Sequence, residues 1–341
     1  MDSSSRRTGF HAFLFQWTVL VATLHMLAGC ATPQLTERLL AQPPVDLPPQ
    51  VELSDVPFFP QELYQCGPAA LAEVLQYRGI EATPEALKGE VYLPERQGSL
   101  QVELIAAARS RGMVVYPLEP SLEDLLAELA AGNPVLVLQN LSLPIYPLWH
   151  YAVVIGYDLS RETLLLRSGT TARQETPLAT FERTWARGDH WAILILPPDQ
   201  LPETADHLKY LTVVQELEAV GRVPQARAAF ETALKKWPRS EIAWFGLGNT
   251  AYALDEFSQA EAAFRALLEI TPLNVPAWNN LAYTLVAQGC DREAEQAAQC
   301  ALALAPTDEN VVATVVDVMK LAGQQTSTAR CAPLHCPKPA P

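Results

Sequence analysis

The C-terminal third of the chain carries residues that recur every 34 positions. This spacing separates Pro238, Pro272 and Pro306, and also Ala226, Ala260 and Ala294. It also separates Trp244 from Trp278 and Phe230 from Phe264. A fixed period of this length is typical of stacked helical pairs. In such pairs a small Ala lets two helices cross closely, Phe fills the space between them, and Pro ends the second helix. We therefore predict an all-α array over residues 207–308.

The order of Trp, Ala, Phe and Pro within each period resembles the tetratricopeptide repeat. The predicted repeats cover about 207–240, 241–274 and 275–308. We expect a capping helix over 309–322, because a terminal repeat needs its open face covered. The tail over 323–341 is polar and rich in proline, so it is predicted to be disordered.

A groove between such repeats is predicted to bind a protein partner, because grooves of this kind hold extended or helical peptides. Acidic side chains occur along the array, which favours a basic peptide partner: Glu216, Glu218, Asp255, Glu256 and Glu261. The whole chain has a formal net charge of −14. Nucleic acid is therefore not expected as a ligand, since phosphate binding needs a basic surface.

The N-terminus has the pattern of an export signal. Arg6 and Arg7 precede an apolar stretch over 12–24 that is too short for a comfortable membrane span. Leu27-Ala28-Gly29-Cys30 follows and resembles the bacterial lipoprotein signal. The alternative is a plain signal anchor.

The lipoprotein resemblance implies that 1–29 is a signal peptide and that Cys30 carries the lipid. A Pro-rich linker over 30–55 would then join the lipid to the first domain. A lipid on Cys30 would hold the protein on a membrane without spanning it. Ala31 rather than Asp follows Cys30, which in lipoproteins favours the outer membrane, facing the periplasm.

Export also permits disulfides, since an exported protein meets oxidising conditions. Cys331 and Cys336 lie close together in the tail and are able to close a small loop. Cys290 and Cys300 lie in the helical region, where they either pair or simply pack. Spacing alone leaves the pairing open.

Residues 56–198 are predicted to form a mixed domain with helices first and strands later, which indicates the α+β class. Apolar periodicity predicts helices over 66–78, 100–111 and 121–131. β-rich runs predict strands over 135–139, 150–157, 163–167 and 191–196.

Cys66 stands at the start of the first of these helices, where free backbone amides favour a thiolate. His150 begins a strand and is a candidate base that would pair with the thiolate as imidazolium, with His190 a second choice. Gln61 is able to donate its amide to the oxygen of a tetrahedral intermediate. The competing interpretation is a buried structural cysteine.

Two blocks carry a family resemblance: VPFFPQELYQCGPAALAEVL at 56–75 and PLWHYAVVIGYD at 147–158. Together they resemble the papain-fold cysteine peptidases related to the bacteriocin-processing, double-glycine leader peptidases. The resemblance implies Cys66 as nucleophile, His150 as general base and acid, and Gln61 as oxyanion donor.

The chain departs from that family in two ways. Gln61 stands five residues before Cys66, where the leader peptidases usually have six. The strand after His150 reads Leu164-Leu165-Leu166-Arg167-Ser168 and lacks the acid that those peptidases carry there. Ser168, as a neutral acceptor, and Asp158, in the preceding turn, are the candidates to orient His150.

These observations predict a membrane-anchored lipoprotein cysteine peptidase that hydrolyses exported peptides or proteins, with the repeats recruiting substrate or partner. Two alternatives stay open. One is a weak or inactive papain-like domain in a repeat-based binding scaffold, and the other is a different thiol acyl transfer on cell-wall peptides. No cofactor is expected, and no metal-ligand spacing is apparent.

Overall fold

The computed structural model describes residues 32–61, 65–321 and 331–337. The predicted signal peptide and Cys30 lie outside these ranges, so the structure does not test them. Among the described residues, no helix is both long and apolar enough to cross a membrane.

The N-terminal domain is built on one seven-stranded sheet whose strand order is β2-β7-β3-β4-β5-β6, with β1 also paired to β4. All of its described pairings are antiparallel. The strands are β1 (Gln50–Glu52), β2 (Val114–Pro117), β3 (Val135–Asn140), β4 (Trp149–Asp158), β5 (Thr163–Ser168), β6 (Thr171–Pro177) and β7 (Ala192–Leu196). The predicted strands are present, and β1, β2 and β6 are additional.

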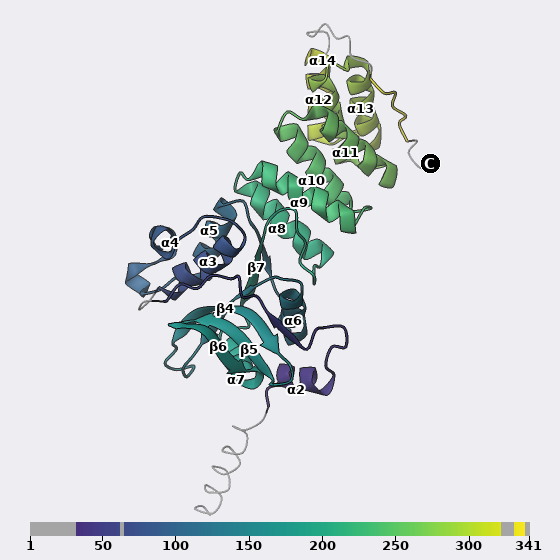
Figure 1. The fold of residues 1–341 in the computed structure, drawn as a ribbon. Helices are drawn as coiled ribbons and strands as arrows, with labels where there is room; N and C mark the ends of the chain where they lie inside the picture. The colour runs from purple at the N-terminus through teal and green to yellow at the C-terminus, as the bar shows by residue number, and fades with distance from the viewer. Residues whose placement is uncertain (1–31, 62–64, 322–330, 338–341) are drawn as a thin grey trace, which may run out of the picture.

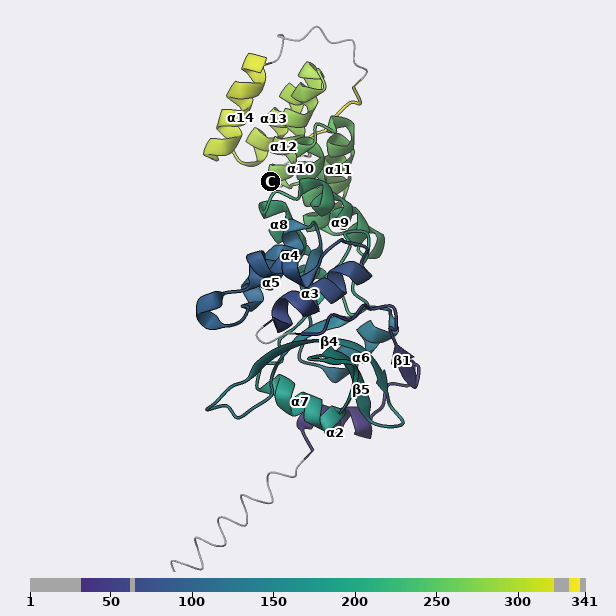
Figure 2. The same cartoon turned by 60° about the vertical axis from the view of Figure 1, so that its left-hand side comes forward.

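Helices cover both faces of this sheet (Figures 1 and 2). One face carries α3 (Cys66–Tyr77), α4 (Pro84–Val91) and α5 (Gln101–Ser110), and the other carries α6 (Leu122–Ala130) and α7 (Leu178–Ala186). The short elements α2 (Gln34–Ala41) and η1 (Pro94–Arg96) complete the domain. Strand β4 shows why two cores form: Tyr151 and Val153 pack with the α3 side, whereas Ala152 packs with the α6 side. The predicted α+β class is confirmed.

The C-terminal part is an array of antiparallel helices (Figure 1). They are α8 (His207–Ala219), α9 (Val223–Lys236), α10 (Glu241–Ala253), α11 (Phe257–Ile270), α12 (Val275–Ala287), α13 (Asp291–Leu304) and α14 (Glu309–Leu321). The indole nitrogen of Trp244 donates to the carbonyl of Pro238 at 2.9 Å, and Trp278 does the same to Pro272 at 2.8 Å. The same hydrogen bond therefore occurs in two successive repeats, at positions 34 residues apart.

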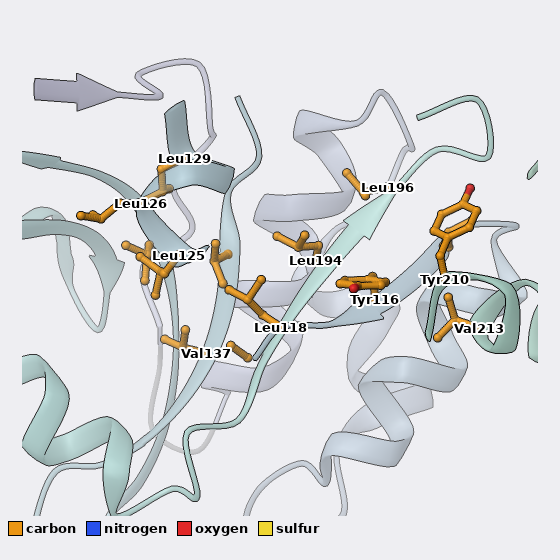
Figure 3. Packing of buried hydrophobic residues seen from close by; sticks show 14 of the residues in the cluster. Tyr116, Leu118, Leu125, Leu126, Leu129, Val137, Leu194, Leu196, Tyr210 and Val213 are labelled. Carbon is orange, nitrogen blue, oxygen red and sulfur yellow. The ribbon is translucent and has the colours of Figure 1, made fainter. Parts of the chain in front are cut away.

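The array continues directly from the sheet domain through a shared core. Tyr210 and Val213 of α8 belong to the same buried cluster as Leu125 of α6 and Leu194 of β7 (Figure 3). At this junction the Tyr116 hydroxyl accepts a hydrogen bond from the backbone amide of Asp206 at 3.0 Å. The first repeat is therefore packed onto the sheet rather than joined to it by a free linker.

Two disulfides tie the C-terminal tail to the repeats. Cys290 pairs with Cys331 and Cys300 with Cys336, with Cα–Cα distances of 5.8 and 5.3 Å. The Cys331–Cys336 loop considered from the sequence is therefore wrong, because each cysteine finds its partner across the helical surface. Leu334 between them is buried, so residues 331–337 differ from the disordered segment expected there. Residues 322–330 and 338–341 lie outside the described part.

Candidate active site

The Cys66 sulfur lies where the start of α3 meets the start of β4. The backbone amides of Cys66 and Gly67 and that of Tyr151 in β4 lie close enough to the sulfur to favour its thiolate and so lower its pKa. The first two amides belong to the opening turn of the helix, where backbone donors have no intrahelical partner. Tyr151 directly follows His150, so this contact places the backbone at the start of β4 beside Cys66.

Gln61 is fixed at the same junction. Its side-chain Oε1 accepts from the Gly169 amide at 3.1 Å, and its Nε2 lies 3.4 Å from the Tyr151 carbonyl, to which it donates. Its own backbone amide donates to the Gly169 carbonyl at 2.9 Å. The side chain is therefore held between the start of β4 and the end of β5, beside the residue whose amide reaches Cys66.

His150 is oriented by Ser168. The imidazole Nε2 and the Ser168 Oγ lie 2.9 Å apart, within hydrogen-bond distance, and Ser168 is buried at the end of β5. This bond occupies Nε2 and leaves Nδ1 as the ring nitrogen available for proton exchange. A neutral hydroxyl thus stands where the related peptidases carry an acid.

Asp158 does not reach this site. It lies eight residues along β4 from His150, about 26 Å away in an extended strand. It is half-buried there and accepts hydrogen bonds from Ser160 and from the amide of Arg161. Its role is to close the turn between β4 and β5. His190, the second-choice base, lies in the loop before β7 and packs edge-on against Trp185.

Burial is the largest influence on the pKa values of Cys66 and His150. It raises the pKa of the Cys66 thiol, although the three backbone amides act in the opposite direction. It also lowers the pKa of His150. Both shifts favour a neutral thiol and a neutral imidazole in the resting site. The predicted resting thiolate–imidazolium pair therefore does not match these directions, because desolvation outweighs the donors at the helix start.

Gly67 leaves no room for a side chain at the start of α3. A side chain at this position would meet the hydroxyl of Ser99. The Ser99 carbonyl accepts from the Tyr151 hydroxyl at 3.2 Å, and the Ser99 hydroxyl is buried without a partner among the described residues. Gly67 is thus needed for close packing between the helix start and this serine.

Two buried ionisable residues on the α3 side of the domain, Glu73 and Arg167, were not anticipated from the sequence. Glu73 of α3 accepts from the Phe59 amide at 3.0 Å, and Arg167 of β5 donates to the Val56 carbonyl at 3.0 and 2.7 Å. Burial raises the pKa of Glu73 to about 8, and the Arg167 guanidinium acts against that rise. The two side chains fix the segment that leads to Gln61. The sequence signal for this feature was a single acidic residue, Glu73, within the apolar run 69–75.

Cys66 is the free cysteine of the described residues. In this same part of the chain, no group of three or more His, Cys, Asp or Glu side chains is placed to hold a metal ion.

Residues 53–192 match the model of the peptidase C39-like family. This segment is a peptidase C39-like domain. Residues 214–275 and 263–296 match two tetratricopeptide repeat models, so the helical array consists of tetratricopeptide repeats. The C39-like domain and the repeats thereby confirm both family resemblances, and the repeats support binding of a protein partner.

Solved structures resemble one or the other part of the chain. A structure named as a C39-like peptidase from Bacillus anthracis has 23% identity and a TM-score of 0.37, covering 43% of this chain and 97% of its own. The first tetratricopeptide repeat domain of Spaghetti, bound to an HSP90 peptide, has 13% identity and a TM-score of 0.32, covering 33% and 90%. A repeat protein from Thermus thermophilus has 22% identity and a TM-score of 0.32, covering 34% and 66%. No curated protein matches the chain.

Proposed function

We propose that the C39-like domain is a cysteine peptidase that cleaves exported peptides or proteins at Cys66. One observation carries the proposal: the contacts of Cys66, Gln61, His150 and Ser168 all converge on residues 150–151 and 168–169. These groups come from three separate segments and fill three different chemical roles. Their side chains have the chemistry required of a nucleophile, a base and an oxyanion donor, which supports the proposal.

The reaction begins when a substrate carbonyl approaches Cys66. The thiol proton passes to His150 Nδ1 while the sulfur bonds to the carbonyl carbon, and Ser168 holds the ring through Nε2. The resulting oxyanion accepts hydrogen bonds from the Cys66 amide and from Gln61 Nε2. The C–N bond then breaks as His150 returns the proton to the amine. A water molecule hydrolyses the thioester through the same proton transfers and releases the acid and the free thiol.

We further propose that a lipid on Cys30 anchors the protein to the outer membrane, facing the periplasm, and that the repeats recruit substrate or partner. The two disulfides support an oxidising compartment, because such bonds rarely persist in the cytosol. The preference for a basic partner loses support, since several of the acidic side chains already have ion partners: Glu216 with Arg109, Glu256 with Arg227, and Glu261 with Arg265.

The test is a comparison of peptide termini in envelope fractions from cells that produce the wild type, Cys66→Ala or His150→Ala. We expect a set of termini that requires both residues. His207→Ala is the matched control, because His207 also contacts a serine, Ser240, at 2.8 Å, but lies in the first repeat. Identical termini in the wild type and Cys66→Ala would refute hydrolysis at this site.

A repeat-based scaffold with a weak or inactive C39-like domain is the second candidate. The neutral Ser168 beside His150 and the raised pKa of Cys66 favour it. Capture of the same partners by the wild type and by Cys66→Ala, with no Cys66-dependent termini, is the result that this candidate expects. New amide linkages in place of new termini would instead indicate acyl transfer to an amine.

A further inference from the structure

The loop between β3 and β4 is an exposed apolar surface. Its large hydrophobic side chains are between 45% and 76% exposed, and they are Leu141, Leu143, Ile145, Tyr146, Leu148 and Trp149. No Asp, Glu, Lys, Arg or His residue occurs between Gln139 and His150. We call residues 141–149 the apolar loop. Scattered single apolar residues are ordinary on a protein surface, but a continuous group of this kind marks a site that another apolar surface covers.

The apolar loop has a defined backbone. The Leu141 amide donates to the Leu148 carbonyl at 2.9 Å, and the Tyr146 amide donates to the Leu143 carbonyl at 3.0 Å. At its base, the side-chain oxygen of Asn140 accepts from the amides of Ser142 and Leu148 at 3.0 and 2.9 Å. These bonds satisfy backbone groups within the loop, so an apolar phase can receive its side chains without leaving those groups unpaired.

Helix α7 contacts both the residue that precedes the apolar loop and the start of α2, which follows Cys30 closely in the sequence. Glu182 of α7 accepts from the amides of Leu35 and Thr36 at 2.8 and 2.6 Å, which fixes the start of α2. Arg187, at the end of α7, donates to the Asn140 carbonyl at 3.0 Å. The two contacting residues are five positions apart, a helical rise of about 7.5 Å. In Figure 2, α2 and α7 lie together at the end of the molecule opposite the later repeats.

Cys30 stands five residues before Leu35, so an extended chain places it at most about 18 Å from α2. The apolar loop and a lipid on Cys30 are therefore within reach of one membrane surface. Trp149 and Tyr146 suit such a surface, because their rings combine an apolar body with a polar edge. The net charge of −14 argues against attraction to anionic headgroups and leaves apolar contact as the source of binding.

We infer that the apolar loop docks into the surface of a lipid bilayer. Docking would orient the domain with His150, the residue that follows the loop, close to the membrane surface. The inference concerns a contact separate from lipidation and from catalysis. It is therefore tested on a chain from residue 30 onward that carries Cys30→Ser, which retains every described residue of the fold.

The test measures partition onto phosphatidylcholine vesicles by flotation. We expect Leu143→Asp to lower the partition coefficient at least about tenfold. Leu208→Asp is the matched control, because Leu208 of α8 is 60% exposed and Leu143 is 62% exposed. Partition of the parent chain should persist in high salt, since apolar burial is not screened. Equal partition of the two variants would overturn the inference.

A second measurement locates the contact. Brominated phosphatidylcholine should quench part of the tryptophan fluorescence, and Trp149→Phe should abolish that quenching while leaving the partition within about threefold of the parent. Binding with quenching that survives Trp149→Phe would assign the contact to another surface. No binding to vesicles, together with an altered termini pattern for Leu143→Asp, would assign the loop to an apolar peptide substrate and overturn the inference.

Discussion

His150 and Ser168 face each other across β4 and β5, with 2.9 Å between Nε2 and Oγ. A hydroxyl at this place orients the imidazole but gives its protonated form no compensating negative charge. The pair therefore explains how a site can be assembled in the manner of a cysteine peptidase and still rest in its neutral form.

Ser168→Asp should make Cys66 more reactive. A carboxylate beside Nε2 should raise the pKa of His150, and the imidazolium that this favours should lower the pKa of Cys66. Alkylation of Cys66 by iodoacetamide at pH 7 should then be about tenfold faster, and Ser168→Ala should be slower than the wild type. Asp158→Asn is the control, because Asp158 lies at the far end of β4 from His150. A Ser168→Asp protein with the wild-type rate, but correctly folded, would contradict the assigned geometry.

The pH profile of Cys66 alkylation should reflect its raised pKa. Only the thiolate reacts, so burial reduces the reactive fraction at neutral pH and the rate should keep rising above pH 9. A plateau reached below pH 8 would show instead an activated thiolate in the resting protein. The profile is measured by mass spectrometry of the Cys66 peptide, with the unfolded chain as the reference.

Glu73 should make the protein less stable as the pH rises. Its pKa in the folded state is about 8, above the usual value, so the folded state retains a proton that the unfolded chain has lost. Stability should fall between about pH 4.5 and pH 8, by an amount on the order of 2–4 kcal/mol. Glu73→Gln should remove this dependence of stability on pH, as measured by urea unfolding. Glu85→Gln, on the surface of α4, should keep it. An unchanged slope in Glu73→Gln would refute the assignment.

The Cys290–Cys331 disulfide should stabilise the last repeat. It closes a separation of 41 residues, and loss of such a link costs about 2–4 kcal/mol. Cys331→Ser should lower the denaturant midpoint of the helical array. Reductant should lower the denaturant midpoint of the wild type by more than that of this variant. The midpoint of Cys66→Ser should respond to reductant as that of the wild type does. Equal sensitivity of the wild type and Cys331→Ser would argue against this pairing.

Local periodicity made much of the fold predictable. The helix at Cys66 and the boundaries set by Pro238 and Pro272 depend on residues close in sequence, and each appears in the structure near its expected place. Strand β6 was not predicted because its sequence TARQETP is polar and mostly exposed, and only pairing with β5 makes it a strand.

The contacts of the site were harder to predict. The alignment of His150 with Ser168 depends on the β4–β5 register, which shifts between Val154 and Gly156. A β-bulge changes which side chains share a face, and the sequence has no plain signal for it here. The disulfide pairing could not be predicted either, because Cys331 and Cys336 are close to their partners in the fold but distant from them in sequence. Glu73 and Arg167 were hidden in apolar runs that suggested only a core.

The core that joins Tyr210 of α8 to Leu194 of β7 has a consequence for substrate choice. Because the repeats are packed onto the sheet, the distance between the repeats and Cys66 is fixed by the fold. A polypeptide bound to the repeats would reach the thiol only after a set length of chain. For the proposed peptidase, the cleavage point would then depend on the number of residues from the bound segment and not only on the residues at the scissile bond.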